Sequence, residues 1–136
     1  MRNKLEKKSV LLLIVLIIVT LGIYVPIWFG KLKKTLDGFK TKQKANGNLI
    51  NFLLVLSILE VVIIIPSVFS PSLDLVSSIL NLTSSIIVLV LAFQFKNILN
   101  EYFNKIQNKN VSFSGIATFF FTIFYLQYKI NRALEK

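Results

Sequence analysis

The sequence contains two apolar runs of 21 residues each, LINFLLVLSILEVVIIIPSVF at 49–69 and LVSSILNLTSSIIVLVLAFQF at 75–95. An α-helix rises 1.5 Å per residue, so each run reaches about 30 Å, the thickness of the hydrocarbon core of a bilayer. The residues between them, SPSLD at 70–74, are turn formers and include no Lys or Arg. The pair therefore predicts an antiparallel transmembrane helical hairpin.

Two further hydrophobic segments flank this hairpin, at about 9–29 and 111–128. The first contains Gly22 and Pro26, and a proline inside a helix removes a backbone hydrogen bond, so we expect a kink or break near residues 22–26. The second is rich in Phe and reaches only about 27 Å as a helix, barely enough for a crossing.

Two polar stretches connect the hydrophobic segments. In the Lys-rich loop 30–48, Leu32, Leu36 and Phe39 recur at helical spacing, which predicts a short helix on the membrane surface. Residues 95–107 carry an apolar stripe between polar residues, which predicts an amphipathic helix continuing the third segment. The predicted fold is all-α: one polytopic membrane domain over 1–136 with four hydrophobic segments and amphipathic interfacial helices.

The composition narrows the classes of function. The chain is 54% hydrophobic and carries 16 Lys and Arg against 6 acidic residues. Because the basic residues adjoin apolar runs, their nearest polyanion is the lipid headgroup layer, and we expect no nucleic-acid partner. The sequence contains no Cys and no His, the residues whose thiolate and imidazole groups most often bind metal ions. We therefore expect no metal site and no cofactor.

Two topologies follow from the basic residues, which favour the cytoplasmic side. If all four segments cross, seven basic residues lie on one side and nine on the other. If only 49–69 and 75–95 cross, while the outer segments enter and return, all 16 lie on one side. The second arrangement agrees better with this preference of basic residues for the cytoplasmic side, and both arrangements stay open. The second arrangement places the termini and basic loops in the cytoplasm.

The residue that most invites a site hypothesis is Glu60, a carboxylate near the middle of an apolar segment. Ionisable groups at mid-membrane depth are costly and usually functional or hydrogen-bonded. Folding the hairpin back at residue 72 places position 60 level with position 84, so Asn81, Ser84 and Ser85 are the predicted partners. Three readings stay open: an interhelical hydrogen-bonded clamp, a proton or ion site, and a group that faces lipid or a partner.

A second set of candidate contacts is basic. Each lysine of the 30–48 loop near an anionic membrane adds about 1 kcal/mol of attraction. The alternative is that these lysines only determine topology, and the sequence favours neither. The candidate headgroup contacts are Lys31, Lys33, Lys34, Lys40, Lys42 and Lys44.

Two stretches carry a family resemblance. Thr20-Leu21-Gly22-Ile23-Tyr24, followed by Trp28-Phe29, resembles the Thr-Cys-Gly-Ile-Tyr…Tyr-Trp signature of the membrane family called domain of unknown function 4234. The stretch Tyr125-Leu126-Gln127-Tyr128-Lys129-Ile130-Asn131 resembles the ending of many members. Leu21 replaces the usual Cys, Ile27 replaces Tyr, and Pro26 is an addition. The resemblance implies a small integral membrane protein of a prokaryotic plasma membrane, and it supplies no activity, cofactor or catalytic residue.

These observations argue against an enzyme, because the chain has no paired carboxylates, no nucleophile–base arrangement and no phosphate-binding glycine loop. We expect a membrane scaffold or accessory subunit that associates with itself or joins a larger complex. The alternatives are a small oligomeric channel or transporter built around Glu60 and a protein that binds anionic lipid at the membrane surface.

Overall fold

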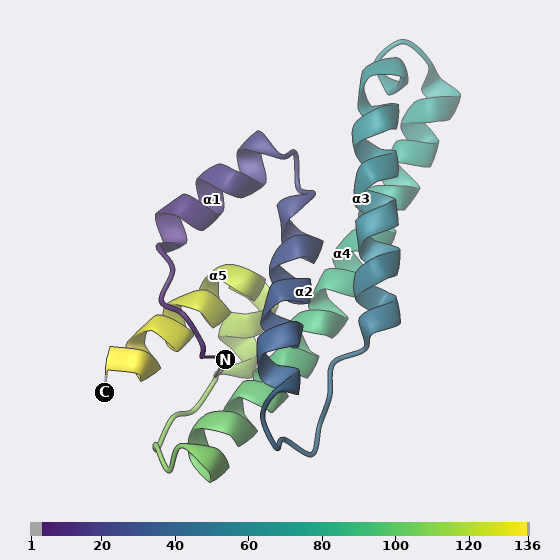
Figure 1. Cartoon of the computed structure of the whole chain (residues 1–136). Coiled ribbons are helices and arrows are strands. Elements are labelled where there is room, and N and C mark those ends of the chain that lie inside the picture. The colour runs from purple at the N-terminus through teal and green to yellow at the C-terminus, as the bar shows by residue number, and fades with distance from the viewer. Residues whose placement is uncertain (1–3, 136) are drawn as a thin grey trace.

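The structure is a computed structural model that describes residues 4–135, and its regular elements are all helical. Five α-helices and one π-helical turn make up this part of the chain (Figure 1). The all-α prediction is confirmed. The elements are α1 (Val10–Val19), α2 (Tyr24–Asp37), α3 (Gly47–Ser67), α4 (Pro71–Glu101), η1 (Tyr102–Ile106) and α5 (Gly115–Glu135).

Helices α3 and α4 form the predicted hairpin and pack along each other. Asn46 caps the start of α3, since its side chain accepts the backbone N–H groups of Asn48 at 3.0 Å and Leu49 at 3.3 Å. Pro71 occupies the first position of α4, where its missing N–H costs nothing. Both helices are long and apolar enough to cross a membrane, and only 22% of the residues in the apolar stretch of each are buried.

The first hydrophobic segment is two helices rather than one. The break lies between α1 and α2, where Leu21 has φ 52° and Gly22 has φ 94°. The Thr20 hydroxyl donates to the Leu16 carbonyl at 2.7 Å and accepts the Tyr24 backbone N–H at 3.0 Å, so it joins the two helix ends. The predicted break is therefore confirmed at Gly22, but Pro26 is not its cause, because this residue lies in the first turn of α2, where a proline is tolerated.

The Lys-rich stretch does not form a separate surface helix. Its first part continues α2 as far as Asp37, and residues 38–46 form a loop, so the helix predicted within the 30–48 stretch is present only to Asp37 and is not a separate one. Leu32 and Leu36 are buried in the core, which accounts for their helical spacing. Phe39 lies beyond the helix end, where its ring centroid is 4.3 Å from that of Tyr102.

The amphipathic continuation of the third segment is present, but its stripe does not face a membrane surface. Helix α4 runs on without a break to Glu101 and ends in the π-helical turn. Phe95 and Phe103 are fully buried, and Phe95 stacks on Phe29 of α2 with ring centroids 5.2 Å apart. The prediction of an interfacial helix was therefore wrong here, because α5 packs along α4, and aromatic rings of α2, the 38–46 loop and the segment before α5 contact the stripe.

The fourth segment begins later and ends later than predicted. Helix α5 is broken at Thr122, whose φ of 39° and ψ of −118° lie outside the helical region. Thr118, one turn earlier, is completely buried, and its hydroxyl donates to the Ser114 carbonyl at 2.7 Å. Both outer segments are thus interrupted helices.

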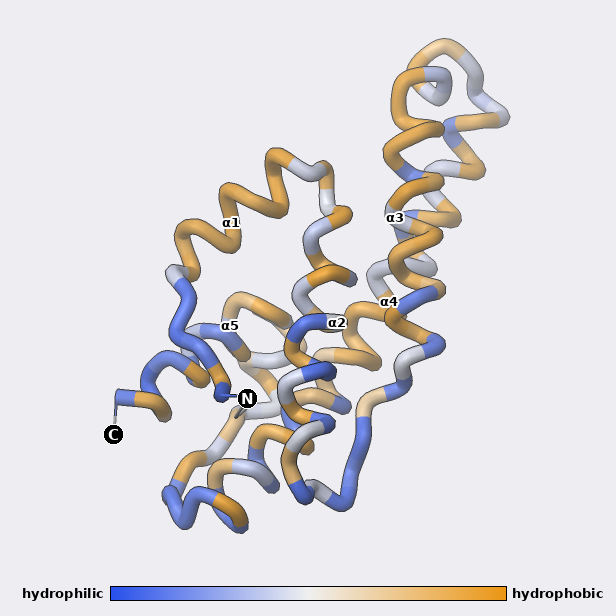
Figure 2. The backbone as a smooth tube through the Cα atoms, in the orientation of Figure 1, coloured by the Kyte–Doolittle hydropathy of each residue, from blue (hydrophilic) through white to orange (hydrophobic). Residues whose placement is uncertain are grey.

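The two ends of the molecule differ in polarity. The far end of the α3–α4 hairpin extends beyond the other helices, and residues 46–95 contain no Lys or Arg (Figure 1). Figure 2 shows apolar residues along α1, α3 and much of α4, and polar residues in the N-terminal segment, the 38–46 loop and the C-terminal turns. The other end of the molecule, opposite the hairpin turn, is polar (Figure 2). Both chain termini lie toward it, as do the 38–46 loop and the loop between η1 and α5 (Figure 1).

Candidate functional site

The hairpin brings Glu60 and Ser84 together as the register arithmetic predicted. The Ser84 hydroxyl donates to Glu60 Oε1 over 2.5 Å. Ser84 is buried, whereas Glu60 is half-buried, so part of its carboxylate faces an open space. This bond ties α3 to α4 about 20 Å from the hairpin turn along α4.

That open space is a pocket of about 360 Å³. Its polar lining includes Glu60 and three serines, Ser57, Ser84 and Ser85. Aliphatic side chains of α2, α3 and α4 also line it. Ser57 lies one turn before Glu60 on the same face of α3, and its hydroxyl donates to the Leu53 carbonyl at 2.8 Å. The pocket therefore presents a carboxylate oxygen and several hydroxyl groups within apolar walls.

The breaks of the two outer segments also lie at this pocket. Gly22, from the α1–α2 turn, and Thr122, from the α5 break, are both among the lining residues. Interrupted helices leave some backbone N–H and C=O groups without their usual helical partners. The arrangement can hold a small hydrogen-bonding group or a cation beside Glu60.

The other two predicted partners of Glu60 behave differently. Ser85 lines the pocket, but its hydroxyl donates to the Asn81 backbone carbonyl at 2.8 Å. The Asn81 side chain is exposed on the outer face of α4, and its amide makes no hydrogen bond to another residue within 4–135. The prediction that Asn81 contacts Glu60 was wrong, because Ser84 lies level with Glu60 and bonds to it, whereas Asn81 lies about one turn nearer the start of α4 with its side chain exposed.

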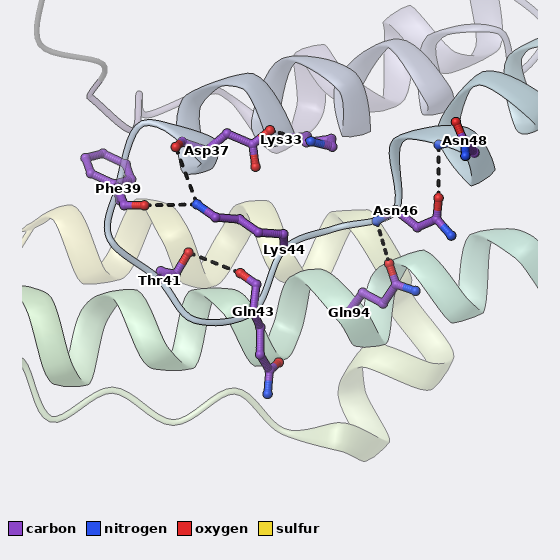
Figure 3. Close-up of polar contacts among 9 residues, drawn as sticks. All are labelled: Lys33, Asp37, Phe39, Thr41, Gln43, Lys44, Asn46, Asn48 and Gln94. Atoms are coloured by element: carbon purple, nitrogen blue, oxygen red, sulfur yellow. Dashed lines mark hydrogen bonds and ion pairs between the residues drawn. The ribbon is translucent and has the colours of Figure 1, made fainter.

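Several of the candidate headgroup lysines serve the chain itself (Figure 3). Lys33 pairs with Asp37 one turn later. Lys44 Nζ donates to the backbone carbonyls of Asp37 at 3.4 Å and Phe39 at 3.0 Å, so it caps the end of α2. Lys40 and Lys42 are exposed on the loop.

The 38–46 loop is also held from α4. The Glu101 carboxylate accepts the backbone N–H groups of Lys42 at 2.8 Å and Gln43 at 3.3 Å. These hydrogen bonds, that from Lys42 first, hold the pKa of Glu101 below its ordinary value despite some desolvation. Gln94 accepts the Asn46 backbone N–H at 3.1 Å (Figure 3), so α4 fixes the loop in its middle and at its C-terminal end.

Lys31 and Lys34 belong to a different site. They line a second pocket, the basic cleft, of about 260 Å³, together with Lys4 and Lys8 of the N-terminal segment. Trp28, Gln127 and Ile130 are also among its lining residues, and all three are buried. The cleft therefore lies between the N-terminal segment, α2 and α5.

A chain of side-chain hydrogen bonds runs beneath this cleft. Trp28 Nε1 donates to Gln127 Oε1 at 3.0 Å, and Gln127 Nε2 donates to Asn131 Oδ1 at 2.9 Å. Asn131 in turn accepts the Lys8 backbone N–H at 3.0 Å and donates to the Lys8 carbonyl at 2.6 Å. The N-terminal segment, α2 and α5 are linked by these bonds.

Residues 8–136 match the protein family described as Domain of unknown function (DUF4234). The chain belongs to this family. The resemblance read from its two signature stretches is confirmed. Comparisons with curated proteins and with solved structures give no match.

In this DUF4234 chain, the residues that carried the resemblance have structural positions. Thr20 and Gly22 form the α1–α2 turn, the first through its hydroxyl and the second through its positive φ. Trp28, from the first signature stretch, contacts Gln127, from the second. The two stretches therefore meet, although 99 positions separate these residues in the sequence.

Sequence reasoning missed part of each site. Ser57 could have been found, because it lies three positions before Glu60 and shares its helix face. Gly22 and Thr122 at the pocket, and Lys4 and Lys8 at the basic cleft, depend on how separate segments dock. Local periodicity carries no signal for such docking.

Proposed function

We propose that the chain is a small non-catalytic integral membrane protein in which α3 and α4 cross the bilayer while α1–α2 and α5 enter it and return. The observation that carries this proposal is the exposed apolar surface of these helices. Val68 at 78% exposure and Phe69 at 84% lie at the far end of the hairpin, and Ile116 at 75% lies on α5. Water would make such a surface prone to aggregation, whereas lipid tails cover it without penalty.

The lengths of the outer helices support their return to the same side. Helix α1 has 10 residues and reaches about 15 Å, half of the hydrocarbon core. The turn at 20–23 then sends the chain back along α2 (Figure 1). With both outer segments returning, all 16 basic residues lie on one side, which the positive-inside rule assigns to the cytoplasm.

Cysteine labelling tests this topology, since the chain has no native Cys. Single cysteines replacing Ser72, Gln43, Asn108 and Ala133 are labelled in intact cells with an impermeant reagent. We expect only the Ser72→Cys variant to react from outside. Labelling of Gln43→Cys and Ala133→Cys from opposite sides would refute the returning outer segments.

Within the membrane, we propose an accessory role through self-association along the outer face of α4. Asn81 lies about 15 Å from the start of α4, near half depth, and its amide faces outward. An amide in hydrocarbon gains from a hydrogen bond to an identical amide on a neighbouring helix. A second copy of the chain supplies such a group in the same position.

The matched variants are Asn81→Leu and Thr83→Val, both on α4. Thr83 already satisfies its hydroxyl by donating to the Ile79 carbonyl at 2.8 Å, so it needs no partner. We expect Asn81→Leu to weaken self-association by about 1–2 kcal/mol, roughly 5- to 30-fold, with Thr83→Val unchanged. Energy transfer between labelled copies in liposomes measures this. A monomeric wild-type protein, or equal losses in both variants, would overturn the proposal.

A second candidate function, proton or cation handling, is favoured by the pocket at Glu60. A carboxylate beside two interrupted helices is the kind of site that transporters place near the bilayer midplane. The variant Glu60→Gln separates the two functions. Self-association in the scaffold role should survive, because the Gln carbonyl still accepts the Ser84 hydroxyl. A cation or proton flux in liposomes that the variant leaves unchanged would exclude the transport role.

A further inference from the structure

We propose that the basic cleft binds the phosphate group of an anionic lipid headgroup. This inference rests on the proposed membrane placement, which puts the cleft at the polar end of the embedded helices. Four lysines, Lys4, Lys8, Lys31 and Lys34, line a pocket of about 260 Å³, large enough for a phosphate and part of its headgroup. Basic pockets between helices on the cytoplasmic side are a known means of holding lipid phosphates.

The net charge of the residues that line the cleft is positive, even when the acidic residue among them is included. Glu6 also lines the cleft, so four lysines face one carboxylate. Lys7 points elsewhere and pairs with Glu135 at 3.7 Å. Lys31 Nζ lies 5.6 Å from the centroid of the Tyr24 ring, from which it can swing to a phosphate because its side chain is exposed.

The cleft is built before any ligand arrives. The backbone of Lys8 is fixed on both sides by Asn131, which accepts its N–H at 3.0 Å and donates to its carbonyl at 2.6 Å. This anchors the N-terminal segment beside α5 and holds its lysines opposite those of α2. A preformed site loses less conformational entropy on binding than a flexible lysine-rich tail would.

The position of Trp28 connects the cleft to the lipid chains. Tryptophan favours the membrane interface, and here its indole is buried in the cleft lining, about one turn before Lys31 and two turns before Lys34 on α2. A lipid whose headgroup phosphate is held by the lysines would have its acyl chains free to run along the exposed apolar surface of α1. A soluble phosphate compound would use the lysines alone.

Trp28 also provides the probe, because it is the single tryptophan of the chain. The full-length protein is reconstituted in phosphatidylcholine nanodiscs containing either brominated phosphatidylglycerol or brominated phosphatidylcholine, and quenching of Trp28 emission is recorded. The test variant is Lys8→Gln with Lys34→Gln. The matched control, Lys40→Gln with Lys42→Gln, removes the same charge from the exposed loop outside the cleft.

We expect brominated phosphatidylglycerol to quench Trp28 at a lower mole fraction than brominated phosphatidylcholine. The cleft variant should reduce this preference about 25-fold, since each lysine contributes roughly five-fold, while the loop control keeps it. Inorganic phosphate and glycerol phosphate are added as competitors. Displacement by these soluble compounds would identify the phosphate group alone as the ligand, and failure to displace identifies the whole lipid; both support the site.

Equal quenching by the two brominated lipids, with no effect of phosphate, would overturn the inference. So would an equal loss of preference in the cleft variant and the loop control. These results differ from a failure of the membrane placement itself, in which neither brominated lipid would quench Trp28.

Discussion

Replacing Gln127 by leucine removes the acceptor of the buried Trp28 indole N–H. In the folded chain this hydrogen bond is 3.0 Å long, Trp28 is 2% exposed and Gln127 is 3% exposed. Water therefore cannot replace the lost partner. The Asn131 carbonyl oxygen loses one donor but still accepts the Lys8 backbone N–H, so the main consequence is an orphaned indole N–H.

An unsatisfied buried donor costs about 1–3 kcal/mol, and we expect Gln127→Leu to destabilise the fold by this amount. Removing both the indole N–H and its acceptor should cost much less than the sum of the two separate replacements, because neither partner of this hydrogen bond is then left unpaired. In the Trp28→Phe background, the additional effect of Gln127→Leu should fall to about 0–1 kcal/mol.

The free energy of unfolding can be measured in detergent by adding sodium dodecyl sulfate and following the helical circular dichroism signal, which does not depend on Trp28. Gln94→Leu is the control, because the hydrogen bond of Gln94 to the Asn46 N–H lies at an exposed position. A Gln127→Leu effect of the same size in wild-type and Trp28→Phe backgrounds would refute the proposed coupling between α2 and α5.

Three further perturbations test local features. Gly22→Ala should destabilise the α1–α2 turn by about 1–2 kcal/mol in the same unfolding assay, because φ is 94° although no atom lies within 4 Å of the added Cβ. Thr122→Gly should stabilise by about 1 kcal/mol, since release of the strained φ of 39° outweighs the entropy of glycine; a loss of stability would show that the Thr122 side chain is needed. The Glu101 carboxylate has a lowered pKa, so its support of the 38–46 loop should be complete above the ordinary glutamate pKa and lost as the pH falls through the folded-state pKa. Amide exchange at Lys42 should then rise on acidification relative to Glu101→Gln at the same pH, and parallel exchange in both proteins would contradict this.

The hairpin could be predicted from the sequence because it depends on local composition. Two apolar runs of 21 residues around a short polar turn leave few alternatives, and the contact of Glu60 with Ser84 follows from counting residues back from that turn. The apolar stripe of 95–107 was also visible, but the sequence did not reveal that other parts of the same chain would cover it. A stripe that faces lipid and one that faces protein have the same periodicity.

The helix breaks show where sequence reasoning stops. Pro26 predicts a helix break, yet the chain breaks at Leu21 and Gly22. Pro26 lies in the first turn of α2, where a backbone N–H would have no partner within the helix. No glycine or proline lies near Thr122, so the sequence gives no local signal for this break. Its conformation depends on the packing of α5 against α4 and α1, which local propensity cannot foresee.

The charge at the hairpin turn bears on how the protein would enter its membrane. Between residues 46 and 95 the chain carries only two ionisable charges, Glu60 and Asp74, and both are acidic. In the proposed orientation, Asp74 moves from the negative interior to the positive exterior during insertion. A membrane potential of 100 mV favours that transfer by up to about 2.3 kcal/mol, whereas it would oppose a lysine equally. Insertion of the hairpin should therefore be assisted by the energised membrane rather than retarded by it.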